Sequence, residues 1–197
     1  DDSIPGVPAQ SYYAVKTYED GDKVNITAAA EGMKAVSSAT VVPSRFPLTS
    51  INFVLKGGEP NQLQFWIHFT DNAQTKDYYA LKVERKRQFW NDSKYSVENS
   101  SLTLNLDDEP LLNTSSGLDD ILMIENEFYR NLYYWDDTKI QGKSYKVRLN
   151  TNYEADYEDD FITPDGVEHI KCQVKYRISL YSLSEEFYRY LKSLNDQ

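Results

Sequence analysis

Apolar and polar residues alternate along most of this chain, which is the pattern of β-strands that bury one face. The alternating segments are 12–18, 23–30, 49–55, 63–70, 77–86, 101–106, 142–150 and 169–181. Turn-forming clusters separate several of them, for example EDGD at 19–22 and GGEPN at 57–61. The succession predicts a mainly antiparallel β fold, either a β-sandwich or a barrel-like sheet with one or two short helices, in a single domain over 1–197.

The alternation gives way to helical spacing at the C-terminus. Four large residues recur at intervals of three and four and so share one helical face: Phe187, Tyr190, Leu191 and Leu194. Ser184 precedes them as an N-cap, and two glutamates follow it where the helix dipole favours negative charge. We therefore expect a C-terminal helix over Ser184–Leu194 that packs across the sheet through Phe187, Leu191 and Leu194.

Two further segments do not fit the strand pattern. The first, LDDILMIENEFYRNLYYW at 118–135, matches helical and extended spacing alike, and we favour a short helix followed by irregular or extended chain. The second, at 150–166, is rich in aspartate and glutamate and predicts a long acidic loop. Its carboxylates could bind calcium or supply a glycosidase pair. The loop lacks the DxDxDG spacing, however, and solvated charge is the simpler interpretation.

Composition narrows the classes of protein to which the chain can belong. The formal net charge of −10 at pH 7 disfavours binding to nucleic acids, whose phosphates are also negative. No apolar run is long enough to cross a membrane. The single cysteine, Cys172, excludes an internal disulfide. Because it shares the apolar phase of the 169–181 segment, we expect a buried and inert thiol.

The familiar catalytic and cofactor-binding motifs do not occur in the sequence. The two histidines, His68 and His169, lie far apart, and there is no HExxH, CxxC, GxSxG, GxGxxG or P-loop spacing. We therefore expect no enzyme activity, no cofactor and no metal site. A hydrolase that uses loop carboxylates such as Asp159 and Asp160 is the alternative from another class.

Aromatic residues are frequent, at 14% of the chain with 16 tyrosines, and such rings suit contacts with sugars, peptides or proteins. Four of them lie beside polar residues at expected strand ends, and we expect them to be exposed and to bind a ligand or partner: Trp90, Trp135, Tyr133 and Tyr134. Trp90 ends the basic stretch RKRQFW at 85–90, and Trp135 precedes two aspartates. The alternative is that these rings are ordinary core packing.

Five stretches, taken in order, resemble a known family. They are YYAVKTYEDGDKVNITAAA, SSATVVPSRFPLTSINF, FWIHFTDNAQTKDYYALKV, YYWDDTKIQGKSYKVRL and ISLYSLSEEFYRYLKSLNDQ. The match runs from about Ser11 to Gln197, nearly the whole chain. Together the stretches resemble the Bacteroidota envelope lipoproteins grouped as domain-of-unknown-function family 4249.

The resemblance implies an outer-membrane lipoprotein of the cell envelope, held by a lipidated N-terminal cysteine that this chain does not contain. Members of that family usually carry an immunoglobulin-like β-domain before this region and a short tail after it. The chain is therefore expected to be the trimmed core of a longer lipoprotein. The genes of the family often neighbour those of TonB-dependent outer-membrane receptors. No catalytic residues are established in the family, so none are carried over.

Three functions follow as hypotheses. The resemblance and the lack of a catalytic motif favour a non-enzymatic lipoprotein that binds a glycan or peptide, or that assists a TonB-dependent receptor in nutrient uptake. The second hypothesis is a structural or adhesive module for protein contacts, which a flat aromatic surface without a pocket would favour. The third is a glycan hydrolase, which would need two carboxylates about 5–10 Å apart in a cleft.

Overall fold

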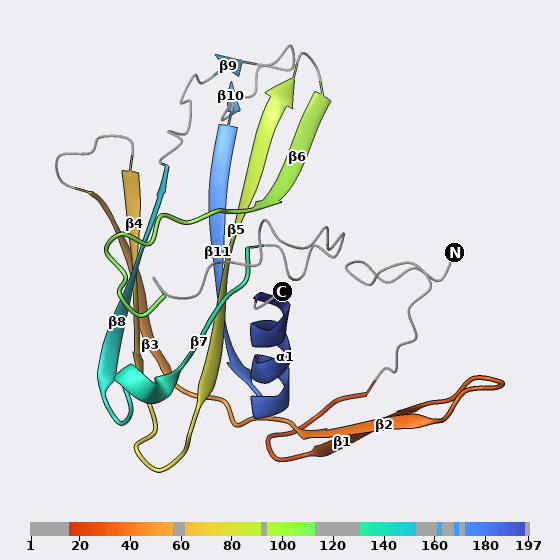
Figure 1. Cartoon of the computed structure of the whole chain (residues 1–197). Helices are drawn as coiled ribbons and strands as arrows, with labels where there is room; N and C mark the ends of the chain where they lie inside the picture. Colours follow the sequence, from red (N-terminus) through yellow and green to blue (C-terminus); the bar gives the residue numbers. More distant parts are fainter. Residues whose placement is uncertain are drawn as a thin grey trace.

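The structure, a computed structural model, is described here for most of the chain (Figure 1). The described residues are 16–56, 62–91, 94–112, 131–152, 161–162, 168–169 and 172–195. The predicted acidic loop at 150–166 therefore lies largely outside them, and so do Asp159, Asp160 and residues 118–130 of the segment 118–135, for which a short helix followed by irregular or extended chain is predicted.

The described chain is mainly antiparallel β structure with a C-terminal helix, as predicted. The strands are β1 (Lys23–Ala28), β2 (Val36–Val41), β3 (Leu48–Leu55), β4 (Gln62–Thr70), β5 (Tyr78–Asn91), β6 (Lys94–Ser101), β7 (Tyr133–Asp136), β8 (Ser144–Asn152), β9 (Phe161–Ile162), β10 (Glu168–His169) and β11 (Cys172–Leu183). A short 3₁₀ helix, η1 (Asp137–Lys139), follows β7, and the helix α1 (Glu185–Asn195) follows β11. Every strand pair in the described residues is antiparallel.

Two sheets face each other across one core. Of the two predicted architectures, the structure therefore has the β-sandwich. The first sheet has the order β3-β4-β8; the second has the order β11-β5-β6, with β7 also paired to β5. In β4 every second side chain is buried, which is the period of a strand with one covered face. The core side chains from the first sheet include Leu63, Phe65, Ile67, Phe69, Val147 and Leu149, and those from the second include Tyr79, Leu81, Val83, Tyr133 and Trp135.

The helix α1 covers part of the outer face of the second sheet (Figure 1). Leu191 is fully buried there against Ala80 and Tyr134, and Phe187 and Leu194 pack beside it, as predicted. The Phe187 amide donates to the Ser184 hydroxyl at 3.3 Å, so Ser184 caps the helix as expected. No helix in the described part of the chain is long and apolar enough to cross a membrane.

Several strand boundaries differ from the predicted ones. β5 continues beyond the predicted end at residue 86 because β6, a polar strand with weak alternation, pairs with its second half. The segment 101–106 is not a strand beyond its first residue; it contributes one bridge, from Asn105 to Asn150. The predicted strand at 12–18 is described only from Lys16, where it is irregular, and the strand that pairs with β1 is β2.

Candidate anion-binding site

The structure places three of the four predicted binding aromatics in the interior. Tyr133, Tyr134 and Trp135 are 3%, 4% and 4% exposed, so the expectation that they lie at the surface is wrong. The reason is the position of β7, which has the main core on one side and α1 on the other. Tyr133 and Trp135 point into the main core, whereas Tyr134 points towards α1 and donates a hydrogen bond to the Leu191 carbonyl at 3.3 Å.

The fourth predicted residue, Trp90, lies near the end of β5, where its backbone pairs with Tyr95. Its side chain is outside the described part of the structure, as is that of Cys172, whose backbone begins β11 opposite Phe89. The predictions for these two side chains therefore stay predictions. Trp66 lies on the outer face of the first sheet, with the Lys146 ammonium 4.4 Å from its ring centroid. Trp66 is thus separate from the buried rings of β7, and these residues form no common aromatic platform.

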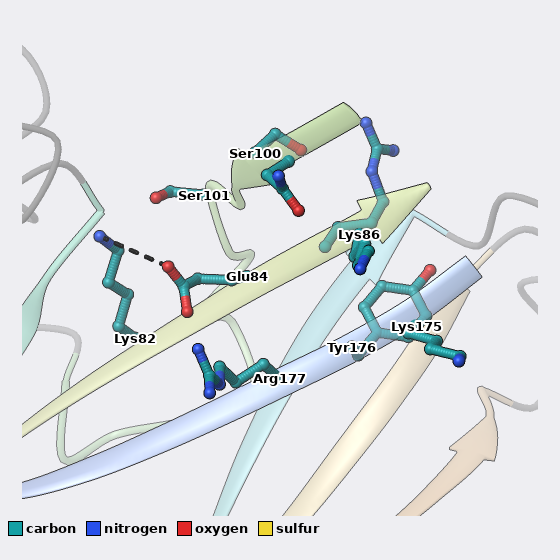
Figure 2. A pocket seen from close by; sticks show the side chains of 10 residues that line it. Lys82, Glu84, Lys86, Ser100, Ser101, Lys175, Tyr176 and Arg177 are labelled. Atoms are coloured by element: carbon teal, nitrogen blue, oxygen red, sulfur yellow. Dashed lines mark ion pairs between the residues drawn. The ribbon is translucent and has the colours of Figure 1, made fainter. Parts of the chain in front are cut away.

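A depression of about 640 Å³ lies on the second sheet, beyond the part that α1 covers. We call it the cationic trough. The charged residues that line it are Lys82, Glu84, Arg85, Lys86, Lys175 and Arg177. Asn99, Ser100, Ser101 and Tyr176 complete the lining. Its side chains come from β5, β6 and β11, which Figure 2 shows from close by.

The strand register explains why these residues meet. Glu84 of β5 pairs with Ser101 of β6 and with Arg177 of β11, which makes one row across the sheet. Directly paired residues of antiparallel strands point to the same face, so the three side chains share the outer face. The next row on this face, two residues along, consists of Asn99, Lys86 and Lys175.

The trough is electropositive although the whole chain is acidic. Four cationic side chains and one carboxylate share the outer face of β5 and β11: Lys82, Lys86, Lys175, Arg177 and Glu84. Lys82 is only 6% exposed, and its ammonium lies 4.0 Å from the Glu84 carboxylate. Figure 2 shows Lys82, Glu84 and Arg177 at one end, with Lys86 and Lys175 further along the strands.

The cations of the trough are spread out rather than focused on one point. Lys82 and Lys86 are four residues apart on β5, which corresponds to about 13 Å along a strand. Neighbouring strands lie about 4.8 Å apart, so Lys86 and Lys175 form an adjacent pair across β5 and β11. Ser101 and Asn99 add neutral hydrogen-bonding groups on the same face. This arrangement suits an extended ligand with several negative charges.

A second cluster consists of three carboxylates, Asp71, Asp77 and Asp137, which lie within 4.8 Å of one another and have the composition of a metal site. Lys76 contacts the Asp137 carboxylate and also lies 3.2 Å from Asp136, so a side-chain cation already neutralises part of this charge. Burial raises the pKa of Asp77, and the negative charges of Asp71 and Asp137 raise it further.

The same carboxylates join neighbouring loops through hydrogen bonds. Asp71 accepts from the Tyr79 hydroxyl and from the Gly142 amide, the latter at 2.7 Å. Burial and the bond to Asp71 raise the pKa of Tyr79 well above its usual value. Gly142 has a φ of +69°, and a Cβ there would lie 2.8 Å from the Ala73 Cβ, so the close approach requires glycine. The carboxylates of this cluster therefore hold the neighbouring loops together.

Sequence reasoning missed the trough, although part of its signal was visible. The basic stretch at 85–90 was singled out for Trp90, whereas the residue of this stretch that shares the outer face of the trough is Lys86. Cationic residues at every second position also occur in the last strand, at Lys175 and Arg177. Cations in alternate positions of two strands could have indicated a basic sheet face, but their pairing becomes visible only in the structure.

Comparisons with known proteins give one match. A family model described as Domain of unknown function (DUF4249) matches residues 4–197. No curated protein and no solved structure matches the chain. The matched range includes both sheets, α1 and every residue of the cationic trough.

Proposed function

The chain belongs to the DUF4249 family of domains of unknown function, and from this premise we propose that it is a non-enzymatic binding module of the cell envelope. Its cationic trough binds a ligand that carries several negative charges. The observation that carries this proposal is that the trough is lined by four cations of the outer face but by a single carboxylate, in a chain with a net charge of −10. The cations are Lys82, Lys86, Lys175 and Arg177, and the carboxylate is that of Glu84.

The spacing of the charges favours an anionic oligosaccharide as the ligand. Lys82 and Lys86 are about 13 Å apart along β5, so an extended ligand suits these cations better than a single phosphate or sulfate. A chain of sugars with carboxylate, sulfate or phosphate groups can reach successive cations. Its hydroxyl groups can also bond with Ser101 and Asn99, which face the same side.

The proposal places this binding in the context of nutrient uptake. The protein is anchored as an outer-membrane lipoprotein and is an accessory partner of a TonB-dependent receptor, to which it presents the bound ligand. The family resemblance supports this part, which is tested by purifying the full-length lipoprotein from native outer membranes. Recovery of a TonB-dependent receptor in stoichiometric amount is expected, and recovery of the lipoprotein alone would count against the partnership.

Ligand binding is tested with three anionic probes: a short oligogalacturonate, a heparin-derived oligosaccharide and inorganic polyphosphate. We expect at least one to bind at low ionic strength and to bind more weakly as salt screens the charges. Replacing Lys86 and Arg177 together by glutamine should weaken binding about tenfold, or ~1.4 kcal/mol. The matched control is Lys192→Gln on α1, also an exposed cation, which should leave binding unchanged.

The three probes also separate the chemical groups that the trough can recognise. A preference for one of them identifies carboxylate, sulfate or phosphate as the charged group. If an acidic peptide binds more tightly than all three probes, the ligand of the trough is a peptide and not an oligosaccharide. No binding of any probe, or equal binding by the double variant, contradicts the proposed role of the trough.

A second function, a protein-interaction module, is favoured by a different observation. The hairpin of β1 and β2 extends away from the sandwich (Figure 1) and exposes large apolar side chains, among them Ile26 at 67% and Val36 at 66%. Isolated two-stranded ribbons are marginally stable in water, so contact with another protein would stabilise this one. Replacing Ile26 by Ser should weaken such contacts without changing binding of the anionic probes.

A further inference from the structure

The first sheet ends in a strand whose outer edge is open. β3 pairs with β4 alone among the described residues, so its other edge has backbone groups without a strand partner. Its eight residues, LTSINFVL, contain no charged residue and no proline. Natural edge strands usually carry such residues because they hinder pairing with another chain. β6 and β11, the outer strands of the second sheet, each contain lysine.

The apolar side chains of β3 face the core side of the sheet but remain exposed. Phe53 pairs with Phe65 of β4, which is 2% exposed, so both point to the same face. Phe53 itself is 70% exposed, and Ile51 and Leu55 on the same face are 40% and 59% exposed.

These side chains are exposed because the second sheet ends at a strand that lies over β4 and does not extend over β3. Its edge strand β11 lies over β4, as the contact between Tyr176 and Phe65 shows, with ring centroids 5.3 Å apart. In the described part of the chain, no strand pairs with the outer edge of β11 to cover β3. The first sheet therefore extends one strand further than its cover among the described residues.

We propose that β3 pairs with the β3 strand of a second copy of this chain across a two-fold axis. In an antiparallel pairing centred on Phe53, the two Phe53 side chains are opposite each other and Ile51 is opposite Leu55 of the second copy. The apolar set is therefore its own complement, as a two-fold interface requires. The irregularity between Leu48 and Ser50 lies outside these central residues and does not interrupt the pairing.

The absence of charged residues on β3 permits a second copy to pair there although each chain is acidic. Each chain has a net charge of −10, so two copies repel each other over most of their surfaces. The uncharged β3 strand lets them approach without like charges directly opposite.

The area of this pairing limits its strength. Such a pairing buries on the order of 1,000 Å² in total, below the roughly 1,200–2,000 Å² of stable interfaces and above most crystal contacts. The expected dimer is weak and depends on concentration. This inference does not rest on the cationic trough.

The first experiment measures oligomeric state by sedimentation over a range of concentrations up to about 1 mM, where even weak pairing is populated. The wild type should change from monomer to dimer, and Phe53→Lys should remain monomeric. The matched control is Tyr190→Lys on α1, which changes another exposed aromatic side chain and should dimerise like the wild type. A monomeric wild type, or a dimer that persists in Phe53→Lys, overturns the proposal.

The second experiment tests the register by cross-linking in a Cys172→Ser background. Phe53→Cys brings two thiols within disulfide range across the two-fold axis and should form a covalent dimer on mild oxidation. Asn52→Cys is the matched control, because Asn52 is also exposed but points to the opposite face. Equal cross-linking of the two variants would mean random collision and would overturn the proposed pairing.

Discussion

The outer face of the second sheet has two regions that the same strands cross. In one region, Ala80 of β5 and Leu183 of β11 are buried beneath α1. In the other, Lys86 and Lys175 of the same two strands are exposed in the cationic trough. The hydrogen-bonded ladder of β5 and β11 continues through both regions without interruption. The difference therefore lies in the side chains alone, which decide whether the sheet binds its own helix or remains open to a ligand.

The border between the two regions is a single row of the ladder. Lys82 pairs with Ser179 there, between Ala80 on one side and Glu84 on the other. Lys82 is almost fully buried, and its ammonium reaches towards Glu84 in the trough. A long side chain can bury its aliphatic part while its charged end lies in a polar environment, which suits a residue at such a border.

The largest expected effect concerns the covered region. Leu191→Asp places a charge without a partner in a site that is 0% exposed and should lower the free energy of unfolding by about 3–5 kcal/mol. Urea denaturation measures this change. Ser193→Asp adds the same group at an exposed position of α1 and should change stability by less than about 0.5 kcal/mol. Equal stability of the two variants would show that α1 does not cover the sheet.

A smaller effect is expected from one hydroxyl in the same region. Tyr134→Phe removes the hydrogen bond to the Leu191 carbonyl, which joins β7 to α1, and should destabilise the protein by about 1 kcal/mol. Thermal denaturation followed by circular dichroism measures the effect. Tyr190→Phe, at a position that is 48% exposed, serves as the control and should have no measurable effect.

The edge of the covered region should be sensitive to acid. Burial would raise the pKa of Asp136, but hydrogen bonds from Thr138 and Lys76 outweigh it and lower the pKa below 3.8. A depressed carboxyl pKa stabilises the fold above pH 3.8 and loses this contribution as the pH falls through the folded-state value. The stability difference between wild type and Asp136→Asn should therefore shrink below about pH 4. A difference independent of pH would contradict this assignment.

The smallest stability effect is expected in the trough. Lys86→Gln and Arg177→Gln change exposed side chains and should alter the free energy of unfolding by less than about 0.5 kcal/mol each. The same variants should weaken binding of anionic probes. Loss of stability comparable to that of Leu191→Asp would show that these cations are structural and would remove the contrast between the two regions.

Much of the fold could be predicted because its signals are local. The period of two in β4 and the capped stripe of α1 both lie within a dozen neighbouring residues, and both are observed. β6 escaped prediction because its sequence, KYSVENSS, is mostly polar and depends on pairing with β5. Local patterns therefore indicated elements with one buried face but not an element held mainly by backbone hydrogen bonds.

The candidate site could not be predicted in the same way. Its residues come from β5, β6 and β11, and the register that aligns Glu84 with Arg177 is a property of the folded sheet. Trp135 was misplaced because two aspartates follow it, which suggested an exposed turn. Asp137 is in fact 0% exposed, since it accepts hydrogen bonds from Lys76 and from the Asp77 amide. Neighbouring charges indicate exposure only when no partner elsewhere in the chain neutralises them.

The pairing of β5 with β11 also has a consequence for the kinetics of folding. The paired residues are more than 80 positions apart in the chain, as with Phe89 and Cys172, so closing this ladder costs much chain entropy before it is stabilised. Folding dominated by such contacts takes milliseconds to seconds. α1, with 11 residues, is too short to persist alone and should form only on the completed sheet. We therefore expect Leu191→Asp to accelerate unfolding while leaving the folding rate nearly unchanged, because α1 docks after the rate-limiting step.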